Sequence, residues 1–154
     1  MLRTLLPIFT VVTMLLLYPA TPGHANKTPD EAKAFLERAI AHIHDVGREA
    51  AFKDFSTPGG EFHDGELYVF CFAADGTTLA HGGNPAFVGK DLSHIKNPDG
   101  KYGNAEIIRT GLEQGSGWVD VRWQNPATKK IEGKGVYVVR LDANSVCASG
   151  YYKG

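Results

Sequence analysis

The amino-acid sequence predicts an α+β domain in which one long helix packs on a five-stranded antiparallel sheet. Apolar residues recur at helical spacing between residues 29 and 46, whereas the chain after residue 66 is rich in short Tyr-, Val- and Phe-containing segments separated by turn residues. The strands follow the long helix in runs instead of alternating with helices. That order favours an antiparallel sheet with helical cover over a parallel Rossmann-type core.

The N-terminal segment has the pattern of a secretory signal peptide. Arg3 supplies a positive start, residues 5–17 form an almost unbroken apolar run, and Gly23-His24-Ala25 offers small residues at a cleavage site. The apolar run is short for a membrane-spanning helix, although an uncleaved anchor is the alternative. We therefore expect a signal peptide over residues 1–25, one domain over residues 26–154, and a periplasmic or secreted protein.

Charge and cysteine content limit the classes of partner and the state of the two cysteines. The formal net charge is −1 and no run of basic residues occurs, which argues against nucleic acid as a partner. The two cysteines, Cys71 and Cys147, stand outside any Cys-x-x-Cys motif. An even number of cysteines in an exported chain favours a disulfide, with two buried free thiols as the alternative.

The long helix has a recognisable start and one apolar face. Thr28 is placed to cap it, Pro29 suits the first helical position, and Glu31 suits the acidic position of a capping box. Gly47 should weaken the helix, and residues 50–55 continue it for another turn or two. The apolar face, which needs a sheet to cover it, consists of Ala32, Phe35, Leu36, Ala39, Ile40, Ile43 and Val46.

The remaining elements follow from turn residues and alternation. Asp75-Gly76 joins two strands of a hairpin, an irregular stretch follows, and Gly115 ends a short helix. The expected strands are residues 66–73, 77–81, 118–124, 133–142 and 145–152, and the expected short helix is residues 104–114.

From Glu66 onward the chain carries an ordered series of short motifs: Leu67-Tyr68-Val69-Phe70, Asp75-Gly76, His81, Gly89-Lys90-Asp91-Leu92, Gly115-Ser116-Gly117-Trp118-Val119, Trp123 with Pro126, Lys134 before Tyr137-Val138, and Gly150-Tyr151-Tyr152. In their order and spacing these motifs resemble those of the single Cache domain family, type 2, of bacterial extracytoplasmic sensors. The sequence departs from the family at Val121, where a Tyr is common, and at residues 145–148, where Trp-rich sequence is usual.

The resemblance implies a PAS-like sheet whose first and last strands are adjacent, which would place Cys71 beside Cys147. It also implies a non-catalytic sensor that binds a small organic acid or a related metabolite. Such a domain would signal through a separate membrane receptor or kinase. The amphipathic helix of residues 29–46 additionally allows a homodimer.

A pocket for a small carboxylate needs a few fixed donors inside an apolar cup. The expected ligand-binding residues are Trp123 as wall, Tyr137 as hydroxyl donor, Lys134 or Arg122 as counter-charge, His81 as a further donor, and Tyr68 and Phe70 as aromatic walls. By the resemblance, Trp123 and Tyr137 face the ligand together. Ordinary core aromatics, solvent-exposed charges and a buried His that binds only loop backbone are the alternatives.

The sequence offers no arrangement typical of catalysis. It contains no Gly-x-Ser-x-Gly motif, no clustered carboxylate pair and no His-x-x-x-His on a helix. We therefore expect neither enzymatic activity nor a metal or cofactor. Two other functions remain open at this point: an interaction module whose pocket has closed, and a sensor that holds haem or a metal through His81.

Overall fold

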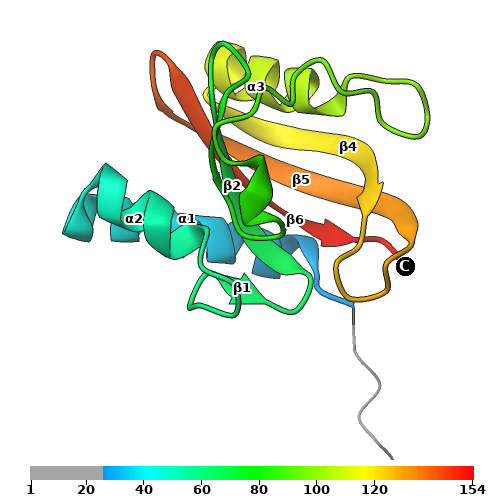
Figure 1. The fold of residues 1–154 in the computed structure, drawn as a ribbon, viewed down its shortest axis with the longest axis horizontal. Helices are drawn as coiled ribbons and strands as arrows, with labels where there is room; N and C mark the ends of the chain where they lie inside the picture. Colours follow the sequence, from blue (N-terminus) through cyan, green and yellow to red (C-terminus); the bar gives the residue numbers. More distant parts are fainter. Residues whose placement is uncertain (1–25) are drawn as a thin grey trace, which may run out of the picture.

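The structure is a computed structural model that describes residues 26–154 (Figure 1). The predicted signal peptide lies outside the described residues. The chain starts with helix α1, Pro29–Val46, which has the bounds predicted from its sequence. The Thr28 side chain accepts a hydrogen bond from the Glu31 N–H at 3.2 Å, and the Glu31 carboxylate accepts one from the Thr28 N–H at 2.7 Å. The predicted capping box is thus present and fixes where the helix begins.

Gly47 separates α1 from a second helix, α2, Arg48–Phe55. Its φ of 87° lies in the left-handed region that favours glycine, and its N–H still donates to the Ile43 carbonyl. The chain therefore changes direction here. The turn or two predicted after Gly47 becomes a separate helix of eight residues.

The sheet has the predicted antiparallel, PAS-like order with one strand more than expected. Along the sheet the order is β1-β2-β6-β5-β4. Strand β3 also pairs with β2, on the edge of β2 opposite to β6. The additional strand is the two-residue β1, which pairs with the start of β2. The strands are β1 His63–Asp64, β2 Leu67–Ala73, β3 Thr78–His81, β4 Ser116–Gln124, β5 Ile131–Asp142 and β6 Ser145–Tyr152.

The two faces of the sheet carry separate hydrophobic cores. On one face α1 and α2 pack against alternate residues of β2 and β6. Ala32, Phe35, Leu36 and Ala39 of the apolar stripe of α1 are buried there, Ile40 and Ile43 are half-buried, and Val46 is exposed. The other face is covered by α3, Gly103–Gln114, and by the segment that contains the short 3-10 helix η1, Pro85–Phe87. Figure 1 shows α3 on the opposite side of the sheet from α1 and α2. This second core contains Tyr68, Phe70 and Phe72 from β2.

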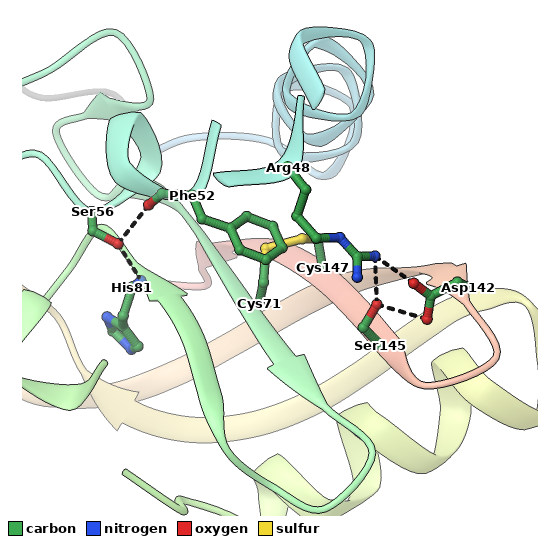
Figure 2. Close-up of a disulfide and its surroundings, with 8 residues drawn as sticks. All are labelled: Arg48, Phe52, Ser56, Cys71, His81, Asp142, Ser145 and Cys147. Atoms are coloured by element: carbon green, nitrogen blue, oxygen red, sulfur yellow. Dashed lines mark hydrogen bonds and ion pairs between the residues drawn. A yellow bond between two sulfur atoms is a disulfide. The ribbon is translucent and has the colours of Figure 1, made fainter. Parts of the chain in front are cut away.

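Cys71 and Cys147 form the predicted disulfide. The two residues are direct partners in the β2–β6 pairing, with Cα atoms 4.1 Å apart, and both are fully buried. Figure 2 shows the disulfide near α2, whose Arg48 contacts Asp142 and Ser145 at the β5–β6 turn. The disulfide thus joins the first and last long strands under the helices.

None of the helices within residues 26–154 combines the length and the apolar character that crossing a bilayer requires.

Candidate ligand-binding site

A small internal cavity lies between the sheet and α3. Its volume is about 10 Å³, which is room for roughly one water molecule. The wall comes from β2, β3, β4, β5 and α3, so that residues far apart in sequence meet there. The lining residues are Tyr68, Phe70, His81, Asn104, Ile107, Val121, Trp123, Lys134 and Val136.

A wider vestibule of about 240 Å³ adjoins this inner cavity. The two spaces share Tyr68, His81 and Trp123 as walls. A ligand could therefore enter through the vestibule and reach the inner cavity. The residues that line only the vestibule are Gly83, Asn84, Phe87, Gln124, Pro126 and Lys129.

Lys134 is the most unusual residue of the inner cavity, because it is a lysine with only 2% of its surface exposed. Its Nζ lies 3.8 Å from the centre of the Tyr68 ring and 4.9 Å from that of Tyr152. No acidic residue among residues 26–154 forms an ion pair with it, and Glu66 acts on it only at longer range. Burial lowers the pKa of Lys134 from 10.5 to about 7. Its ammonium form therefore lacks both solvent and a counter-ion.

His81 presents a hydrogen-bond donor in the same place. Its Nδ1 accepts a hydrogen bond from the Asn84 N–H at 2.9 Å, which leaves the proton of the neutral ring on Nε2. Burial, with a smaller contribution from Lys134, lowers the pKa of His81 to about 3, so the ring is neutral at physiological pH. Its backbone N–H donates to Ser56 Oγ at 3.1 Å, which ties β3 to the end of α2 (Figure 2).

The phenol of Tyr68 is held by a second tyrosine. The Tyr152 hydroxyl donates to the Gln124 carbonyl at 2.8 Å, so the proton of the 3.4 Å contact between the two hydroxyls comes from Tyr68. Burial raises the pKa of Tyr68 to about 12. Both phenols therefore stay protonated, and the ring of Tyr68 remains a neutral wall beside Lys134.

Five of the seven residues predicted to bind ligand meet around these cavities: Tyr68, Phe70, His81, Trp123 and Lys134. The predicted placement of Tyr137 beside Trp123 is wrong. Tyr137 pairs with Trp118 across β4 and β5, and Trp118 lies on the opposite face of β4 from Trp123. The Tyr137 ring packs on Trp118 at 5.1 Å, on the side of the sheet that carries α1.

Arg122 also lies away from the cavities. It precedes Trp123 in β4, so strand alternation directs it to the other face, where it is exposed and donates to the Ile131 carbonyl at 3.3 Å. Of the two counter-charges that the sequence suggested, only Lys134 lines the cavity.

The sequence interpretation missed the residues that loops and α3 contribute. Asn104 lines the inner cavity, where its amide donates to the Leu92 carbonyl at 3.1 Å. Asn84, Gln124 and Lys129 line the vestibule. The Gly150-Tyr151-Tyr152 motif was the available signal for Tyr152, whereas no local pattern marks the others.

The polar side chains of the inner cavity are suited to binding an anionic group. Within residues 26–154 no three His, Cys, Asp or Glu side chains gather as metal ligands. The inner cavity is lined by the polar side chains of Lys134, His81 and Asn104, beside the aromatic residues Tyr68, Phe70 and Trp123. A cationic donor and a neutral donor inside an aromatic wall are what an anionic group of a small molecule requires.

Comparison with known proteins gives the chain a family. The family model of Single Cache domain 2 matches residues 24–149. The sensor histidine kinase MctS of Rhizobium johnstonii is 33% identical over 86 residues, which cover 55% of this chain and 18% of the kinase. The chain thus corresponds to a small part of that relative.

Solved structures share the fold. A methyl-accepting chemotaxis protein from Vibrio parahaemolyticus has a TM-score of 0.65 and 21% identity over 80% of this chain and 86% of its own. A periplasmic sensor domain of a chemotaxis protein has a TM-score of 0.64 and 27% identity, and the match covers 81% of this chain and 90% of its own. A Cache chemosensory domain described for carboxylic acid recognition has a TM-score of 0.63 and 23% identity, and the match covers 81% of this chain and 88% of its own. The chain belongs to the Single Cache domain 2 family, whose sensor domains bind ligands without catalysis.

Proposed function

We propose that this domain works outside the cytoplasm as a sensor that binds a small carboxylate between β2, β4, β5 and α3. The observation that carries the proposal is Lys134, a buried lysine without an acidic partner among the described residues. A buried ammonium is unfavourable unless it is paired, and a ligand carboxylate would supply the missing charge. One structural neighbour is itself described for carboxylic acid recognition, which supports the proposal.

The residues around the cavity have distinct roles in this proposal. Lys134 binds the carboxylate as an ion pair, and the Nε2–H of His81 donates a second hydrogen bond. The carboxylate displaces the single water for which the inner cavity has room, while Trp123 and Phe87 border the remainder of the ligand in the vestibule. Because the walls exclude water, each charge-assisted contact is stronger than it would be at the surface.

Export and signalling are parts of the same proposal. The N-terminal pattern, the disulfide and the periplasmic neighbour all support a location outside the cytoplasm. The bound state would then pass to a membrane receptor or a kinase, the classes of protein among its relatives. Ala32, Phe35, Leu36 and Ala39 of α1 are buried against the sheet, so a homodimer through this helix would have to use its exposed positions, Val46 among them.

Thermal-shift measurements on the oxidised protein test the binding function. We expect two- to four-carbon monocarboxylates to raise the melting temperature, whereas the matched amides, which have the same shape without the charge, should not. Lys134→Met should abolish the response, and Lys101→Met, which removes an exposed lysine, should leave it intact. A flat response to every acid, in protein that is folded, would contradict the proposal.

The same experiment separates the closed-pocket alternative. An interaction module would show no acid-dependent shift, since its inner cavity would stay at its present volume of about 10 Å³. The haem alternative requires space for a large macrocycle next to His81, whose ring is packed against Tyr68, Phe70 and Phe87.

A further inference from the structure

The combined cavity and vestibule carry positive charge at two places. Lys134 lines the inner cavity and Lys129 lines the vestibule. No Asp or Glu of the described chain lines either space. Because Tyr68, His81 and Trp123 border both, the two lysines belong to one continuous site.

Lys129 is held in place by an ordered turn. Its N–H donates to the Asn125 carbonyl at 2.8 Å, and its carbonyl accepts a hydrogen bond from the Gln124 amide at 3.1 Å. Its φ is 62°, and within residues 26–154 it is the sole non-glycine residue with a positive φ. A lysine in this conformation costs about 1 kcal/mol relative to glycine. The strained position of a cationic residue at the mouth of a binding site favours a function for its side chain.

The vestibule also has an uncharged hydrogen-bond donor, the side-chain amide of Asn84. The Asn84 side chain uses its oxygen to accept the Ala86 N–H at 3.1 Å, so its NH₂ group remains as a donor. The vestibule volume of about 240 Å³ is ample for a short carbon chain that ends in a second polar group. Ammonium and amide donors without acidic residues suit a second anionic group.

We propose that the preferred ligand is a short dicarboxylate, with one carboxylate at Lys134 and His81 and the other at Lys129 and Asn84. This inference rests on the proposed carboxylate-binding function and adds the class of acid. The ligand spans the shared wall of Tyr68 and Trp123, so that its two negative charges match the two lysines.

Calorimetric titration with the acid pair butanedioate and butanoate, which differ only in the second carboxylate, tests the inference. We expect the native protein to bind butanedioate about threefold more tightly, the effect of one exposed ion pair. Lys129→Gln should weaken the binding of butanedioate more than that of butanoate and so remove this difference. Lys130→Gln, which removes the neighbouring exposed lysine of the same turn, should preserve the difference. High salt should reduce the preference because the vestibule is open to solvent.

The outcomes distinguish a failure of the dicarboxylate preference from a failure of carboxylate binding itself. If butanoate binds as tightly as butanedioate, or if Lys129→Gln weakens both acids equally, the dicarboxylate inference is wrong while carboxylate binding stands. If neither acid binds the folded protein, the carboxylate-binding function itself is wrong.

Discussion

Replacing Lys134 by methionine should stabilise the ligand-free domain, in spite of the loss of a charged residue. The lysine is 2% exposed and has no ion-pair partner among the described residues. In the ligand-free domain its charge therefore lowers the free energy of unfolding. Methionine has a similar length and an apolar end. It can occupy the space between the Tyr68 and Tyr152 rings without desolvating a charge.

The pKa of Lys134 sets the size of the effect. A fall from 10.5 to about 7 in the folded state corresponds to ~5 kcal/mol against the charged form, at 1.36 kcal/mol for each pKa unit. We therefore expect Lys134→Met to raise the free energy of unfolding by up to about 5 kcal/mol at pH 6.

The gain should depend on pH in a defined direction. Between pH 7 and pH 10.5 the unfolded chain holds a proton on Lys134 that the folded chain has released. Stability of the native sequence therefore rises with pH across this window, and Lys134→Met lacks that rise. The difference between the two proteins is largest below pH 7 and shrinks toward pH 10. Other titrating groups are common to both proteins and cancel in the difference.

Urea unfolding at pH 6, 7, 8 and 9, followed by the fluorescence of Trp118 and Trp123, measures this difference. Lys101→Met serves as the control, because it removes an exposed lysine and should change the free energy of unfolding by less than about 0.5 kcal/mol at every pH. If Lys134→Met is no more stable than the native protein at pH 6, or if its gain is constant with pH, the reasoning about a buried unpaired charge is refuted.

Three other predictions follow from the same contacts. Binding of propanoate should take up close to one proton at pH 8 and about half a proton at pH 7, because the carboxylate restores the charge of Lys134. Titration calorimetry in buffers of different ionisation enthalpy measures this proton uptake, and its absence would contradict the ion pair. Replacing Cys71 and Cys147 together by alanine should lower the free energy of unfolding by about 4 kcal/mol, since the disulfide closes a loop with a sequence separation of 76; an unchanged urea midpoint would contradict this. Ser56→Ala should cost about 1–2 kcal/mol, because the His81 N–H loses its acceptor, whereas Ser56→Thr, which keeps the hydroxyl, should cost less; equal losses in both would show that the hydrogen bond is not the cause.

Much of the fold could be predicted because local patterns encode it. The capping box and the spacing of apolar residues fixed α1 at both ends, and the turn at Asp75-Gly76 separated β2 from β3. The sheet order, by contrast, came from the family resemblance and not from any local pattern. The two-residue strand β1 was missed because a pairing this short leaves no alternation in the sequence.

The site was harder to predict because it depends on register. Alternation predicts which residues of one strand share a face, but not which face of β5 matches which face of β4. The pairing of Tyr137 with Trp118 decided that, and it placed Tyr137 on the side of α1. Lys134 was identified as a candidate, but its burial depends on contacts with Tyr68 and Tyr152 from other strands. The contribution of Lys129 depends on the conformation of a turn, which the sequence does not specify.

A crystal structure of the protein grown with propanoate tests the central claim most directly. The account predicts the acid in the cavity between β2, β4, β5 and α3, with a carboxylate oxygen about 2.8 Å from Lys134 Nζ. It also predicts the second oxygen within hydrogen-bonding distance of His81 Nε2. An empty cavity at saturating acid, or a carboxylate bound elsewhere on the domain with Lys134 still unpaired, would contradict it.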